Sequence, residues 1–418
     1  MLTAFAKKFD RIGPFWVGVI FAILCANAVY LVRAMIATWL SADPAIATDW
    51  GFIRGNDFVA FWSAADMAVR GEPESAYDVT AIQAAERKLI GVENWGVLPW
   101  LYPPTYLLLM LPFGHMSYFP ALALWQTLPL IGLMLVMSRF GLPRLLYWLI
   151  PLSASVVQTI VAGQNSLLVT LLLAGGLLSL ERHPKIAGVL FALVTFKPQL
   201  ALLVGPALII GGHWRTLGAM VAALAVLVGI SLAVFGTGSW LAFFQNLSFA
   251  QDQLGQGGLP WRRMPTVFVA ARMSGLAVTS AQLVQGVVAL GAVAGVAWAW
   301  WHRVPFNLRA ALLVAAILLT TPYAYDYDQV ILLLPIAWLI LEAQREPLKH
   351  FEIAAMVLVW LLPSWWMLAL AREIGVTLGL VILLAFYGTI LNRAVRAQRT
   401  LRGGEEGNLR KRRAESAE

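Results

Sequence analysis

The sequence predicts an all-α polytopic membrane protein with about 12 transmembrane helices. Of its 418 residues, 60% are apolar and only 12% are charged, whereas a soluble domain typically carries about 25% charged residues. The apolar residues lie in runs long enough to cross about 30 Å of hydrocarbon. Short polar breaks containing Gly, Pro, Trp and Arg separate these runs. Lipid is therefore the expected solvent for most of the chain.

The first apolar run covers residues 14–40 and follows a cytoplasmic N-terminus, residues 1–13, that contains three basic residues. A secretory signal has a shorter apolar core and ends in a small-residue cleavage site. This run is too long and no A-x-A exit follows it, so we expect a retained span. The single cysteine, Cys25, lies inside it, which excludes a disulfide framework or a paired-cysteine metal site within one chain.

Residues 41–100 form the first loop, which contains nine acidic and four basic residues. Because cytoplasmic loops carry an excess of Lys and Arg, this loop is expected outside. Residues 58–69 and 81–90 within it place apolar side chains at helical spacing. We expect both segments to form helices that lie at the membrane interface.

Short basic turns mark the cytoplasmic side in the rest of the chain. They lie at residues 139–144, 182–185, 213–215, 302–309 and 345–349. For all of these turns to lie on the cytoplasmic side, residues 101–138 must cross the membrane once although a polar break interrupts them. Residues 184–212 must cross it twice although the segment is only 29 residues long. We interpret both as broken or re-entrant helices, which membrane proteins tolerate only around a buried or wet cavity.

This threading gives a single transmembrane domain, residues 14–392, and a basic cytoplasmic tail, residues 393–418. Eight Lys and Arg residues crowd into positions 393–413, as is typical of the cytoplasmic side of a last span. The tail's charge and low apolar content predict disorder. The net charge is +8, but no basic stripe with interleaved aromatics is visible elsewhere, so we expect membrane lipids and no nucleic acid as partners.

The polar segments that least resemble simple turns share the predicted outer side. They are the segment around Asp57, the GQN at 163–165, the KPQ at 197–199, the loop 236–265 and the turn 321–329. Asp57 could serve as a general base at the mouth of a cavity. The alternative is that it caps the following helix.

Cations on this side suggest an anionic ligand. Lys197 is an intramembrane charge, a functional candidate by default, although a lysine at a span end could also snorkel to the surface. Arg262 and Arg263 lie on the outer side against the positive-inside trend. They fit an anionic headgroup or a harmless exception equally well.

Five motifs follow one another from about residue 56 to residue 329: NDFVAFWSAADMAVRGEPESAYD, YPPTYLLLMLPF, GQNSLL, GVLFALVTFKPQ and TPYAYDYD. Together they resemble glycosyltransferase family 87, membrane enzymes that use polyprenyl-phosphate sugars and include mannosyltransferases. The resemblance implies the type C glycosyltransferase fold in a bacterial inner membrane, with the active site facing the periplasm or cell exterior. It also implies inverting transfer to a lipid or glycan hydroxyl, without a nucleotide cofactor, and we predict no metal.

The resemblance assigns roles to individual residues. Asp57 matches the catalytic base, and Lys197 with Arg262 or Arg263 matches the donor-phosphate site. The expected substrate-binding residues are Arg54, Tyr102, Gln164, Asn165, Gln199, Tyr323, Asp326 and Asp328. Relatives carry a histidine where this chain has Tyr323, so no acid or base role is transferred to that position.

A transporter or flippase for lipids or lipid-linked sugars is the competing interpretation. Discontinuous helices and a buried lysine are common in carriers. Carriers also tend to contain inverted repeats, and no repeat is visible in this sequence. The chain has no G-x-x-x-x-G-K-[ST] loop and no H-E-x-x-H, so energy must come from an activated substrate or an ion gradient.

Overall fold

In the computed structural model of the chain, residues 14–40, 45–48, 53–361 and 378–415 are described. No strand occurs in these ranges, which confirms the all-α prediction for them. Four of their helices contain a span long and apolar enough to cross a bilayer. They are α6 (Tyr118–Met137), α13 (Trp214–Gln256), α15 (Val278–Trp301) and α20 (Leu378–Glu415). The predicted count of about 12 crossings is not confirmed.

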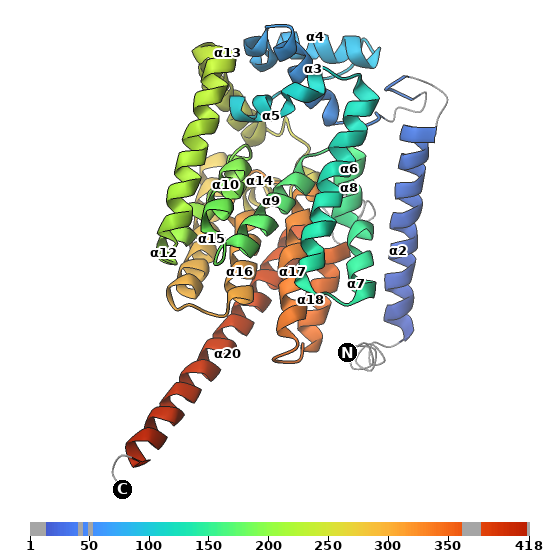
Figure 1. Cartoon of the computed structure of the whole chain (residues 1–418). Helices are drawn as coiled ribbons and strands as arrows, with labels where there is room; N and C mark the ends of the chain where they lie inside the picture. Colours follow the sequence, from blue (N-terminus) through green and yellow to red (C-terminus); the bar gives the residue numbers. More distant parts are fainter. Residues whose placement is uncertain (1–13, 41–44, 49–52, 362–377, 416–418) are drawn as a thin grey trace.

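The predicted first span is helical, as α2 (Pro14–Met35) and the short turn η1 (Ile36–Leu40). The loop after it contains α3 (Phe58–Val69), η2 (Pro73–Tyr77) and α4 (Val79–Ile90), so both helices predicted there are confirmed. Three residues separate α5 (Pro104–Gly114) from α6, at the predicted polar break. In Figure 1, α3, α4 and α5 lie across one end of the molecule, here called the loop end, while α2, α6 and α13 run toward the other end.

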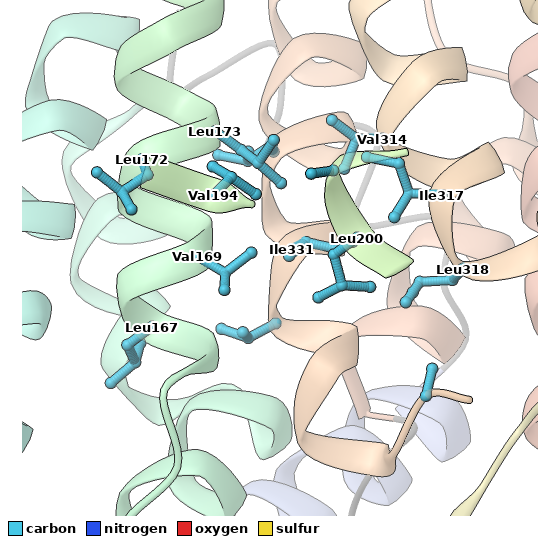
Figure 2. Packing of buried hydrophobic residues seen from close by; sticks show 14 of the residues in the cluster. Leu167, Val169, Leu172, Leu173, Val194, Leu200, Val314, Ile317, Leu318 and Ile331 are labelled. Carbon is cyan, nitrogen blue, oxygen red and sulfur yellow. The ribbon is translucent and has the colours of Figure 1, made fainter. Parts of the chain in front are cut away.

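Three groups of short helices fill the interior. They are α8 (Ala154–Ala162) with α9 (Ser166–Ser179), α10 (Pro184–Val194) with α11 (Pro198–Ala201) and α12 (Val204–Ile210), and α16 (Phe306–Thr320) with η6 (Asp326–Leu332) and α17 (Leu333–Glu342). Figure 2 shows Leu172, Val194, Leu200, Val314 and Ile331 packed where these groups of helices meet.

Residues 184–212 are broken as predicted, but two full crossings are not what the structure shows. Helix α10 has 11 residues, which gives a length of about 16 Å at 1.5 Å per residue. A crossing needs about 20 residues. The two predicted crossings are therefore not confirmed, and Lys197, which directly precedes α11, is buried in the protein.

The opposite end of the molecule, here called the basic end, gathers the turns that the sequence predicted to share one side. Arg309, near the start of α16, pairs with Glu181 after α9 at 3.0 Å, and the His213 ring contacts Trp300 at 5.7 Å between centroids. Arg393 on α20 is buried and pairs with Glu352 at 2.8 Å. The remaining short helices are η3 (Ser138–Phe140), α7 (Arg144–Trp148), η4 (Ile150–Leu152), η5 (Trp261–Arg263), α14 (Val267–Met273) and α18 (His350–Leu361).

The sequence predicted disorder for residues 393–418, whereas the structure continues α20 as one helix to Glu415. The tail contains many strong helix formers such as Ala, Arg, Leu and Glu. A helix that already exists in the membrane can extend through them without a new nucleation step.

Candidate active site

Asp57 directly precedes α3, but its side chain does not cap that helix. Its Oδ1 accepts a hydrogen bond from Asn56 Nδ2 at 2.5 Å, and its Oδ2 accepts one from Gln164 Nε2 at 2.8 Å. The alternative interpretation of Asp57 as a helix cap is therefore wrong. No ion pair is recorded for this carboxylate within the described ranges, so two neutral amides hold it.

The loop that carries Asp57 lies directly against the tip between α8 and α9. The Asp57 backbone N–H donates to the Ala162 carbonyl at 2.9 Å. Gly163 has φ +68°, and a Cβ there would lie 2.6 Å from the Gly55 carbonyl oxygen. Trp125 Nε1 donates to the Gly163 carbonyl at 3.1 Å. Only glycine permits both this left-handed turn and this close approach.

The orientation of the Gln164 amide is fixed by its own neighbours. Its Oε1 accepts from the Asn165 backbone N–H at 3.1 Å, so its Nε2 faces the Asp57 carboxylate and also donates to Tyr327 Oη at 3.2 Å. Asn165 Nδ2 donates to Tyr106 Oη at 3.1 Å. The predicted GQN motif thus holds the predicted acid in place.

Lys197 joins the three short-helix tips. Its ammonium lies 2.5 Å from Asp328 Oδ1, 3.0 Å from Asn165 Oδ1 and 3.3 Å from Ser166 Oγ. The residue is only 2% exposed, so the alternative of a snorkelling lysine is wrong. Asp328 in turn accepts from Ser166 Oγ at 2.6 Å and from the Tyr325 backbone N–H at 3.0 Å. A cation and an anion therefore neutralise each other at the centre of the fold.

Arg263 is the more accessible cation of the site. Its Nε and Nη2 each lie 3.0 Å from a different oxygen of Asp326, in the two-pronged geometry that guanidinium and carboxylate prefer. Its side chain is 28% exposed, against 1% for Asp326. Its guanidinium also lies 5.6 Å from the centre of the Tyr327 ring.

Burial raises the pKa of the Asp57 carboxyl above its usual range, and the positive charge of Arg263 is the largest opposing influence. The hydrogen bond from Gln164 opposes the rise as well. A carboxylate with a raised pKa binds a proton more strongly than an ordinary aspartate does. Asp57 therefore has the electrostatic character of a general base.

Two rows of aromatic rings border these polar groups. Tyr102 lies 4.6 Å from Tyr106 between ring centres, and Tyr106 stacks on Phe196 at 4.7 Å. Tyr323 contacts Tyr325 at 5.6 Å, and that ring stacks on the Tyr327 ring at 5.1 Å. Tyr102 and Tyr323 are half-buried and so form the accessible members of the two rows.

Two predicted site residues, Arg262 and Gln199, have no recorded hydrogen bond to this network among the described residues. Arg54 is buried with its guanidinium 5.8 Å from the centre of the Phe119 ring. Arg262 is exposed and Gln199 is half-buried, and no hydrogen bond is recorded for either side chain among the described residues. In the same part of the chain, no group of three or more His, Cys, Asp or Glu side chains is arranged to hold a metal ion.

Three residues of the network were given no site role in the sequence analysis, namely Asn56, Tyr106 and Ser166. Each lies within a motif that was recognised, next to or near a predicted residue. Ser166 follows the GQN directly and Tyr106 follows the double proline. Extending each motif by one helical turn would have found them.

A sequence model described as Glycosyltransferase family 87 matches residues 100–322, more than half of the chain. The matched range contains Gln164, Lys197 and Arg263. It begins after Asp57 and ends before Asp326. No curated protein and no solved structure matches the chain.

Proposed function

We propose, from the premise that the chain belongs to glycosyltransferase family 87, that this membrane glycosyltransferase uses a polyprenyl-phosphate sugar as donor. The sugar is a mannose-like hexose, and the acceptor is a hydroxyl group of a lipid or glycan. The reaction inverts the anomeric centre. It takes place at the periplasmic or outer face of a bacterial plasma membrane, where the acidic first loop is predicted to lie.

The observation that supports this proposal most strongly is the state of Asp57. A carboxylate in an ion pair is a weak base, because its partner stabilises the charged form. Asp57 accepts instead from the neutral amides of Asn56 and Gln164, and its burial raises its pKa. It keeps lone pairs for the proton of an incoming hydroxyl.

In the proposed step, the acceptor oxygen attacks the anomeric carbon and forms the new glycosidic bond. The bond between that carbon and the phosphate oxygen breaks, and polyprenyl phosphate leaves with the bonding electrons. The acceptor proton passes to the Asp57 carboxylate. Cations near the departing oxygen stabilise the charge that develops there.

The contacts of the cations support a division of roles between them. Lys197 is already matched by Asp328 at 2.5 Å and is nearly inaccessible. Arg263 keeps part of its side chain exposed while Asp326 orients it, and Arg262 is exposed beside it. We therefore assign the donor phosphate to Arg263, assisted by Arg262, and assign Lys197 the role of holding the three tips together.

A flippase or transporter for lipid-linked sugars would use the same buried polar groups without cleaving the donor. Incubation of the purified protein with polyprenyl-phosphate sugars and candidate lipid acceptors separates the two functions. The glycosyltransferase releases polyprenyl phosphate in step with glycosylated acceptor. A flippase moves the donor across vesicles and releases none, and that result would reject the proposal.

Asp57→Asn tests the base assignment. We expect turnover to fall by about 10²–10⁴, because the amide cannot take the acceptor proton, while donor affinity stays near that of the wild type. Asp66→Asn is the matched control on α3, because Asp66 is a partly exposed residue paired with Arg70. Turnover of Asp57→Asn within about twofold of wild type would show that another group is the base.

A further inference from the structure

A groove of about 770 Å³ lies between α10 and the first half of α13, separate from the candidate active site. Its lining is almost entirely apolar except at one end. The residues that define it are Lys185, Val189, Leu193, Arg215, Gly218 and Ala222. The two helices approach closely beside it, since a Cβ on Gly188 would lie 2.5 Å from the Thr216 carbonyl oxygen.

The groove faces lipid. Val189 and Val226, which line it, expose 45% and 59% of their surface, and the α13 segment is apolar enough to cross a bilayer. Water in such a groove would find almost no hydrogen-bonding partner. An acyl chain fills it without that loss.

The dimensions of the groove suit one leaflet. Helix α10 has 11 residues and extends about 16 Å, close to half of the bilayer's hydrocarbon thickness of about 30 Å. Small residues, Gly218 and Ala222 among them, form the floor on α13. They leave room for a chain that lies along the helix axis.

The polar end of the groove is positive. Lys185 and Arg215 line it together with Trp214, and all three side chains are exposed. No ion pair is recorded for either cation among the described residues, and no lining residue is acidic. Basic pockets between transmembrane helices bind anionic headgroups, and an exposed tryptophan is typical of the headgroup level.

We propose that this groove binds one anionic glycerophospholipid, with its phosphate between Lys185 and Arg215 and one acyl chain along α13. Helix α13 starts next to α12 and runs toward the end that carries α3 and α4 (Figure 1). The headgroup therefore lies in the leaflet at the basic end, opposite the candidate active site. The bound acyl chain packs on α10, and the last turn of that helix leads to Lys197.

The test measures lipid retention by native mass spectrometry of the full-length protein in detergent, titrated with dioleoylphosphatidylglycerol or dioleoylphosphatidylcholine. Two variants probe the two ends of the groove. Lys185→Gln with Arg215→Gln removes the cations. Gly218→Leu adds a side chain to the groove at a position that lines it and where an added Cβ meets nothing within 4 Å.

Each variant has a matched control. Arg139→Gln with Arg144→Gln removes two exposed cations from another turn at the basic end. Gly229→Leu adds the same side chain to α13 outside the groove, at a glycine whose Cβ also meets nothing within 4 Å. Both controls should retain lipid as the wild type does.

We expect the wild type to retain one phosphatidylglycerol at a concentration about tenfold or more below that needed for phosphatidylcholine. The double glutamine variant should lose this preference, and Gly218→Leu should retain neither lipid. Equal retention of the two lipids by the wild type would overturn the proposal, as would unchanged retention by Gly218→Leu. A change in oligomeric mass in that variant without a change in lipid would assign the groove to a second copy of the chain.

Discussion

At the scale of single residues, the charged side chains of the site differ in whether an ion-pair partner or neutral amides contact them. Lys197 and Asp328 balance each other, with side chains only 3% and 1% exposed. Asp326 is matched by an arginine that solvent can reach. Asp57 is held by amides alone. Of these carboxylates, Asp57 is the one with no recorded ion pair among the described residues, which suits it to exchange a proton.

The Lys197–Asp328 pair leads to a prediction about stability. Lys197→Met leaves the Asp328 carboxylate buried without its cation and should destabilise the protein by about 3–5 kcal/mol. The double variant with Asp328→Asn removes both charges and should recover most of this loss. Thermal unfolding of the purified variants in detergent measures both effects.

Kinetics of the double variant separate a structural lysine from a phosphate-binding one. If Lys197 mainly holds the tips together, the KM for the donor stays within about fivefold of the wild type. A rise of about a hundredfold with restored stability would mean that the ammonium binds the donor phosphate directly.

At the scale of elements, the ends of the short helices place the polar side chains of the site next to one another. The sequence predicted the breaks near residues 115, 163 and 197 from Gly, Pro and polar residues inside apolar runs. It did not predict how deep each segment reaches, since helix length depends on where packing lets the chain turn. The two crossings predicted for residues 184–212 are therefore not confirmed, because the helices there are shorter than a full span.

Gly163→Ala should reduce activity more than stability. The substitution strains a backbone at φ +68° and pushes a Cβ against the Gly55 carbonyl, which moves the Asp57 loop off the α8–α9 tip. We expect kcat to fall at least about tenfold, equivalent to about 1.4 kcal/mol. Gly141→Ala is the control, because Gly141 has φ +65° but its Cβ would meet nothing within 4 Å. Equal losses of activity in both variants would contradict the proposed contact.

Glu86 on α4 predicts a pH response of the loop end. Burial raises the pKa of its carboxyl to about 7, against hydrogen bonds from the Leu98 backbone and Trp95 that lower it. The folded state thus favours the protonated acid. Its stabilising contribution is complete below about pH 4.5, the ordinary pKa, and is lost as the pH rises through about 7.

We therefore expect backbone amides of residues 91–100 to lose protection from hydrogen exchange as the pH rises through 7, after correction for the intrinsic exchange rate. Glu86→Gln removes the ionisable group and should keep protection constant over this range. Protection in the wild type that is equally constant would show that Glu86 does not control this segment.

At the scale of the whole molecule, two polar layers lie at different depths. One layer joins Glu181, Arg309, Glu352 and Arg393 with neighbouring turns at the basic end. The other is the site under α3. The sequence predicted the same separation, because it placed the basic turns on one side of the membrane and the polar segments of the site on the other. Which end faces the cytoplasm is part of the proposed function.

The orientation can be tested with single cysteines, because Cys25 is the only native one. In a Cys25→Ser background, Glu93→Cys should react with a membrane-impermeant maleimide in intact cells. Arg144→Cys should react only after permeabilisation. Both positions are exposed in the structure, so their labelling reports the side of the membrane. Reversed labelling would place the active site in the cytoplasm and reject the proposed topology.

The composition and hydropathy of the sequence were enough to predict a helical membrane protein, because they report the local environment of each residue. The family came from the resemblance of five ordered motifs, and the family model that matches residues 100–322 confirms it. The pairing of Lys197 with Asp328, 131 residues away, and the contact of Gln164 with Asp57 are visible only in the folded structure. Such pairings depend on how the helices pack, and no periodicity within a single segment encodes them.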